Sequence, residues 1–139
     1  MVNVNNENFF IFNVLEKFSQ HYKKLWTYNV EIEPIDQTIE TVQVSALRVN
    51  PFGRPGAMYE LIRIRSLDGL VPCSLDAIHM GDNYNKIRID NIDELFFILQ
   101  SIMESDSTIN IVKSLANEAA TRRQGSRNIT YNIAHHMFK

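Results

Sequence analysis

Two segments with strand-like alternation, joined by a loop rich in proline and glycine, most constrain what this chain can fold into. The segments are Ile39–Val49 and Ala57–Leu67. In the second, Ile62 and Ile64 share one face, because successive side chains of a strand point to opposite faces. Two prolines and two glycines lie between the segments, and both residue types end strands and turn the chain. The sequence therefore predicts an antiparallel pair of strands.

The first segment and the loop each carry an interpretation of their own. Val42, Val44 and Ala46 share one face of the segment, and Gln43 and Ser45 share the other, which fits a half-buried sheet. The loop holds Arg54 among its glycines, so its backbone is a candidate phosphate cradle. It matches neither a P-loop nor a dinucleotide-binding fingerprint, and a plain hairpin connection is the simpler interpretation.

The other elements follow from helical and strand periodicities and from capping residues. In the first part of the chain we expect a helix from an Asn8 cap to about Trp26 and a strand over Tyr28–Glu33 closed by Pro34. After an Asp68-Gly69 turn we expect a short strand over Leu70–Cys73, a helical turn within Ser74–Met80 and a strand over Lys86–Asp90. Two helices should follow, one capped by Asn91 and ending near Glu104, the other running from Ser105-Asp106-Ser107 to about Arg123 and ended by Gly125.

These elements predict an α+β domain. Its antiparallel sheet has four to five strands, covered by an N-terminal helix and two C-terminal helices. With 139 residues the chain is long enough for one domain, spanning 1–139, that buries a core without disulfides. The polar segments 1–7 and 124–139 are predicted to be flexible.

Charge and cysteine content exclude several classes of protein. A net charge of −2 and a pI near 6.1 disfavour wholesale binding to nucleic acid or membranes. The single cysteine, Cys73, excludes an internal disulfide and a multi-cysteine zinc site. We see neither a signal peptide nor an apolar run long enough to span a membrane, and we expect a cytoplasmic protein.

No catalytic or cofactor motif is recognisable. The four histidines show no ligand spacing, and the adjacent pair His135-His136 lies near the end of the chain. Cys73, with His79 six residues later, is the one candidate nucleophile and base, but no family signature surrounds it. The carboxylates show no paired spacing. We therefore predict a protein that is not an enzyme and that uses neither a metal nor a cofactor.

An aromatic surplus at the start of the first helix is the best candidate partner-binding surface. Phe9, Phe10 and Phe12 widen the apolar face beyond what one packing contact needs. Together with Arg54 they predict a site for another protein, and a homodimer through a helix face or a sheet edge is a further possibility.

Alternating basic residues give the other candidate surface. Arg63, Arg65, Lys86 and Arg88 each alternate with isoleucine, so all four can project from the solvent side of one sheet and track phosphates. The alternative interpretation pairs these arginines with Glu31, Glu33 and Glu40 on neighbouring strands. A second basic cluster, at the end of the last helix, consists of Arg122, Arg123 and Arg127.

The order of elements resembles the layout of small type III secretion chaperones. That resemblance implies a homodimer that binds extended segments of secreted proteins. The layout is also similar to the amino-terminal part of siderophore synthetases of the IucA/IucC type. Their nucleotide-binding histidine-proline motif is absent here, so this second resemblance implies an inactive piece.

The sequence thus predicts a non-enzymatic protein-binding module, such as a small chaperone, adaptor, inhibitor or immunity-type protein. It would act through an apolar helix face or a sheet edge. The alternative is a nucleic-acid-binding accessory protein that uses the basic sheet face.

Overall fold

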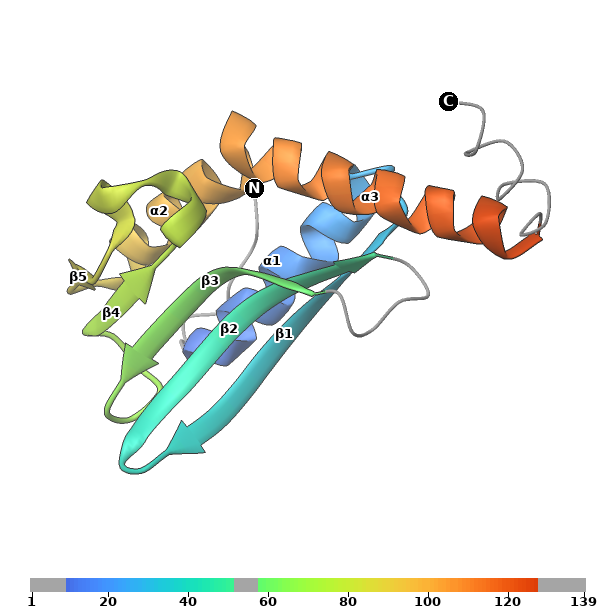
Figure 1. The fold of residues 1–139 in the computed structure, drawn as a ribbon. Coiled ribbons are helices and arrows are strands. Elements are labelled where there is room, and N and C mark those ends of the chain that lie inside the picture. The colour runs from blue at the N-terminus through green and yellow to red at the C-terminus, as the bar shows by residue number, and fades with distance from the viewer. Residues whose placement is uncertain (1–9, 52–57, 128–139) are drawn as a thin grey trace.

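In a computed structural model, the described part of the chain folds into three α-helices and one five-stranded antiparallel sheet (Figure 1). The structure describes residues 10–51 and 58–127, with the side chains of 119–127 excepted. The predicted α+β class is therefore confirmed. The predicted flexible segment 1–7 and Arg54 lie outside the described residues, as does most of the predicted flexible segment 124–139.

The sheet is a meander, because its spatial order β1-β2-β3-β4-β5 is also the order along the chain. The strands of the sheet are β1 (Val30–Ile39), β2 (Val42–Pro51), β3 (Tyr59–Ser66), β4 (Cys73–Asp76) and β5 (Ile87–Ile89). The α-helices are α1 (Ile11–Leu25), α2 (Ile92–Met103) and α3 (Asp106–Arg127). Two short 3₁₀ helices, η1 (Ile78–Met80) and η2 (Asp82–Tyr84), lie between β4 and β5.

Helix α1 packs its apolar stripe against the sheet. The stripe is fully buried and consists of Ile11, Val14, Leu15, Phe18 and Tyr22. The helix begins at Ile11, later than the predicted cap at Asn8, which lies outside the described residues. No side chain caps this end. Instead, the Ile11 N–H donates to the Gly69 carbonyl at 2.8 Å, which ties the start of α1 to the loop between β3 and β4.

The first hairpin differs from the prediction. Strand β1 continues through Pro34 to Ile39, and the chain turns at Glu40, whose φ is 59°. The prediction that Pro34 ends the strand was wrong because β1 lies at the border of the sheet. A proline on an edge strand costs no hydrogen bond when its nitrogen points away from the neighbouring strand.

The predicted shared face of Val42, Val44 and Ala46 is confirmed, and it lies opposite the core side of β2. Leu47 pairs with Ile62 on the core side, whereas Ala46 pairs with Arg63 on the opposite side. Val44 and Ala46 are nevertheless 4% and 2% exposed. Long arginine side chains flank these small residues, and such side chains bury their aliphatic stems while their heads stay in solvent. Strand β2 is thus apolar on both faces, which its alternation alone could not reveal.

A register shift between β2 and β3 adds to the core. Arg48 pairs with Glu60 and Leu47 pairs with Ile62, so Leu61 has no partner on β2. An extra residue of this kind is a β-bulge, which places two successive side chains on the same side of the sheet. Leu61 and Ile62 are both 0% exposed. The predicted alternation of isoleucines with arginines on β3 is confirmed from Ile62 onward.

The second half of the chain matches the prediction in its helices and differs in its strands. Asn91 caps α2 by accepting from the Glu94 N–H at 2.9 Å, and Ser105 accepts from the Thr108 N–H at 3.2 Å at the start of α3. The strand predicted over Leu70–Cys73 begins only at Cys73, and β4 occupies part of the segment predicted to be a helical turn. Helix α3 continues past Gly125 to Arg127.

The bulge predicts that Leu61, on β3, contributes much more to stability than Leu67, which follows the strand. Leu61→Ala should lower the free energy of unfolding by about 2–5 kcal/mol, because it removes a fully buried side chain and leaves a cavity. The control Leu67→Ala, at a side chain that is 82% exposed, should change it by less than about 0.5 kcal/mol. Urea unfolding of both variants checks this, and equal losses would contradict the bulge.

Candidate partner-binding surface

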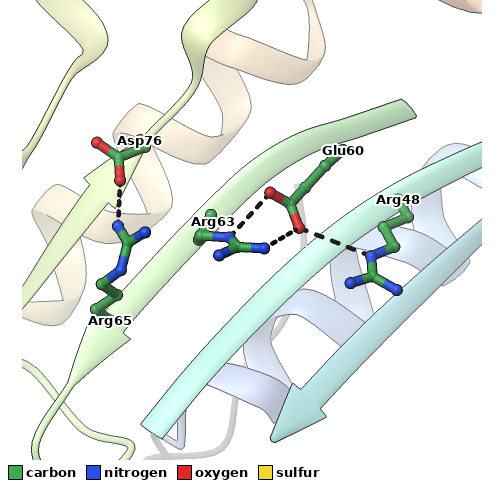
Figure 2. A network of polar contacts seen from close by, with 5 residues as sticks. All are labelled: Arg48, Glu60, Arg63, Arg65 and Asp76. Atoms are coloured by element: carbon green, nitrogen blue, oxygen red, sulfur yellow. Dashed lines mark hydrogen bonds and ion pairs between the residues drawn. The ribbon is translucent and has the colours of Figure 1, made fainter. Parts of the chain in front are cut away.

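Five charged side chains form a ladder of ion pairs on the outer face of the sheet, the face of β2–β4 that carries the arginines (Figure 2). We call Arg48, Glu60, Arg63, Arg65 and Asp76 the outer ladder. The Arg63 guanidinium donates to both oxygens of Glu60, at 2.9 and 3.1 Å. The Nε atom of Arg48 lies 3.7 Å from the same carboxylate. Glu60 thus forms ion pairs with two arginines at once, and its hydrogen bond raises the pKa of Arg63.

Asp76 is the most buried member of the outer ladder, with a side chain that is 11% exposed. One of its oxygens pairs with Arg65 on β3, and the other accepts from the Lys86 N–H at 2.6 Å. Lys86 directly precedes β5. The Asp76 carboxylate therefore connects β3 and β4 with the residue that precedes β5. Lys86, whose φ is 54°, is bound to Asp76 through its backbone N–H.

The arginines take partners other than the predicted ones. Glu60 and Asp76 bind Arg63 and Arg65, and the exposed Asp90 binds Arg88 at 2.7 Å. The predicted pairing with Glu31, Glu33 and Glu40 was wrong, because closer carboxylates are available within β3 and on β4.

Within the part of the chain that the structure describes, this pairing leaves two carboxylates of β1 without an ion pair. Glu31 and Glu33 lie exposed on the outer face of β1. No ion pair reaches either of them within the described residues. Glu33 stands opposite Arg48, but the ion pair of Arg48 is the one between its Nε atom and Glu60 (Figure 2). Glu33 accepts a 3.5 Å hydrogen bond from the Asn50 amide.

The predicted basic residues are not all brought together. Arg63, Arg65 and Arg88 share the outer face, since Arg65 and Arg88 both align with Ser74 in the strand register. Lys86 lies outside β5, in a left-handed backbone conformation, and is not part of this row. Three further arginines lie on the last turns of α3: Arg122, Arg123 and Arg127.

Strand β1 has a free edge. It pairs with β2 over all ten of its residues, and no strand of the described chain pairs with its other side (Figure 1). The opposite border of the sheet is β5, which has only three residues. An edge strand presents a row of unpaired N–H and C=O groups to other chains. Pro34 was the sequence signal for this edge, since prolines within sheets are confined to such strands.

A hollow of about 330 Å³ lies between the start of α1 and the β1–β2 hairpin. Phe10, which is 47% exposed, and Phe12 line it, so two of the predicted partner-binding residues meet here. Phe9 and Arg54 lie outside the described residues. Asp36 of β1 also lines the hollow and accepts from Gln43 at 2.6 Å and from Ser45 at 3.0 Å. The hollow and the β1 edge thus share Asp36.

Cys73 and His79 do not form a reactive pair. Cys73 is buried, and burial raises the pKa of its thiol to about 11, so the thiolate is scarce at neutral pH. The Nε2 atom of His79 lies 2.8 Å from the Thr108 hydroxyl, and the His79 ring stands edge-on to Tyr59. His79 therefore contacts the start of α3 rather than Cys73.

The described residues contain neither a metal-binding cluster nor a helix that could span a membrane. No group of three or more histidine, cysteine, aspartate or glutamate side chains in that part of the chain is placed to hold a metal ion. No helix among residues 10–51 and 58–127 is both long and apolar enough to cross a membrane.

Comparisons with protein-family models, curated proteins and solved structures find no match. They therefore add no functional information to the geometry described above.

Asp76 should contribute more to stability than the exposed carboxylate Asp90. Asp76→Ala removes a partner of Arg65 and the acceptor of the Lys86 N–H, so it should lower the free energy of unfolding by about 1–3 kcal/mol. Asp90→Ala breaks only the exposed pair with Arg88 and should cost less than about 1 kcal/mol. Denaturant titrations at low and high salt measure both losses. If the two variants lose the same amount, Asp76 does not connect the strands as described.

His79 predicts that stability falls in mild acid. Burial lowers the pKa of His79, and its Nδ1 atom is buried without a hydrogen bond. In the unfolded chain the pKa returns to about 6.5. Protonation of His79 therefore favours the unfolded state. The stability that the protein gains from keeping His79 neutral is complete above the unfolded pKa and is lost as the pH falls below it. Thermal melts from pH 8 to 5 should show a shallower decline in His79→Gln than in the wild type, and equal declines would contradict this role of His79.

Proposed function

We propose that this chain is a non-enzymatic protein-binding module that accepts an extended segment of another protein as an added strand beside β1. The observation that carries the proposal is the free edge of β1, ten residues long at the border of the sheet. Strand addition is a general mode of peptide recognition, in which backbone hydrogen bonds supply affinity and alternate side chains supply specificity.

The backbone of β1 offers donors in a definite pattern. Pro34 lacks an N–H, and we infer that its nitrogen faces the free edge, as for prolines in other edge strands. N–H groups of alternate residues in a strand point to the same side. The N–H groups of Ile32, Asp36 and Thr38 then also face the free edge. An added strand can bond to these groups without disturbing β2.

Nucleic-acid binding by the outer face has less support. The Nε atoms of Arg63 and Arg88 lie 2.9 and 2.7 Å from carboxylates, and Arg65 pairs with the largely buried Asp76. A phosphate would have to displace these partners. The exposed pair of Arg88 with Asp90 is the easiest of the three to open, because exposed ion pairs are weak.

Two variants at Thr38 test strand addition. Thr38→Pro removes an edge donor, whereas Thr38→Val removes only the side-chain hydrogen bond to Gln43. The tagged protein and both variants are used to capture partners from extract of the native source, with and without nuclease. We expect one protein at fixed stoichiometry with the wild type and Thr38→Val, and at least about tenfold less with Thr38→Pro.

The controls separate this proposal from its alternative. All three proteins should melt within a few degrees of one another, because the Thr38 N–H is inferred to make no bond to β2. Equal capture by Thr38→Pro would overturn strand addition at β1. Recovery of nucleic acid, with loss of the captured proteins after nuclease treatment, would favour the outer face instead.

A further inference from the structure

We propose that the segment added beside β1 is basic, with lysine or arginine at the two alternate positions that face Glu31 and Glu33. This inference rests on the proposed function and specifies the chemistry of the partner. Strand β1 carries three carboxylates, from Glu31, Glu33 and Asp36, and no basic residue. The edge is therefore acidic, although the whole chain carries a net charge of only −2.

The outer ladder explains why this charge is available to a partner. Glu60 and Asp76 hold Arg48, Arg63 and Arg65 on the interior strands. No cation of the described residues forms an ion pair with Glu31 or Glu33. Opposite charges facing each other on adjacent strands are stabilising, and like charges are destabilising. A neighbouring strand thus gains most when it brings cations to these two positions.

The remainder of β1 specifies further positions of the partner. Glu31, Glu33, Ile35, Gln37 and Ile39 share the outer face. Ile39 is 46% exposed, and Ile35 is partly exposed. In an antiparallel partner whose first position faces Ile39, the fifth position faces Ile35, the seventh faces Glu33 and the ninth faces Glu31. A partner that matches this face therefore has apolar residues at positions 1 and 5 and basic residues at positions 7 and 9.

The inner face of β1 also carries groups that attract a cation. Asp36 lies on this face and lines the hollow together with Phe10 and Phe12. Aromatic faces attract cations, as carboxylates do. A basic side chain of the added strand that faces Asp36 would find both kinds of group there.

A second copy of this chain is a poor occupant of the edge. Two β1 strands paired antiparallel over residues 31–39 would place Ile39 and Gln37 opposite Glu31 and Glu33, and neither copy would bring a cation to these carboxylates. The edge therefore favours a partner of opposite charge over a second copy.

Three nine-residue peptides of defined sequence test the charge pattern. The first has isoleucine at positions 1 and 5 and lysine at positions 7 and 9, with threonine elsewhere. The second has the same composition but carries its lysines at positions 6 and 8, which turns them to the opposite face. The third replaces both lysines with glutamate. Affinity is measured by titration in low salt, and the binding site is located by amide hydrogen exchange.

We expect the first peptide to bind about tenfold more tightly than the second, and the glutamate peptide to bind most weakly. Bound peptide should protect the amides of Asp36 and Thr38. The full-length variant Glu31→Lys/Glu33→Lys should reverse the order and prefer the glutamate peptide. Glu31→Gln/Glu33→Gln, which adds no positive charge, should bind all three peptides about equally.

The outcomes distinguish this inference from the proposed function. If all three peptides bind equally, protect β1 and are blocked by Thr38→Pro, strand addition stands and the basic-partner inference is overturned. If no peptide protects β1, the inference is overturned as well, and the capture experiment decides the proposed function. A concentration-dependent dimer of the wild type that protects β1 would also overturn the inference, since a second copy would then occupy the edge.

Discussion

The pairing of β2 with β3 includes one extra residue, and the arrangement of both faces of the sheet depends on it. Because Leu61 has no partner on β2, it joins Ile62 on the core side, under the helices. The same shift leaves Glu60 and Arg63 on the outer face, three residues apart, where they bind each other and Glu60 also reaches Arg48. A regular ladder would alternate without interruption and put Glu60 and Arg63 on opposite faces.

Much of the fold could be predicted from the sequence because the helices have clear periodicity and two of them, α2 and α3, have clear caps. The Asn91 cap of α2 is an example. The strands were harder. Pro34 was interpreted as the end of a strand because the sequence does not say which strand lies at the border of the sheet. The alternation placed Val44 and Ala46 on one face without showing which face it is, because apolar side chains can be covered by the core or by arginine stems on the outer face.

The candidate surface was predictable only in part. The aromatic surplus at Phe10 and Phe12 was visible in the sequence, and the structure places both residues around one hollow. The ion pairs of the arginines could not be predicted from the sequence. Alternation shows which face the arginines occupy but not which carboxylates they bind. Glu31 and Glu33 were interpreted as partners for those arginines. They became candidates for binding only once the structure showed the arginines satisfied elsewhere.

The attachment of α1 has a consequence for the order in which the chain becomes ordered during synthesis. Helix α1 is made first, yet its first N–H bonds to Gly69, and its Tyr22 hydroxyl donates to Glu104 at 2.7 Å. Neither acceptor exists while α1 emerges from the ribosome. Its aromatic and aliphatic stripe can pack only once β1 and β2, the strands it contacts most, have followed it, and the Glu104 partner of Tyr22 comes 82 residues after Tyr22. Until these segments are made, part of the stripe is exposed and open to association with other chains.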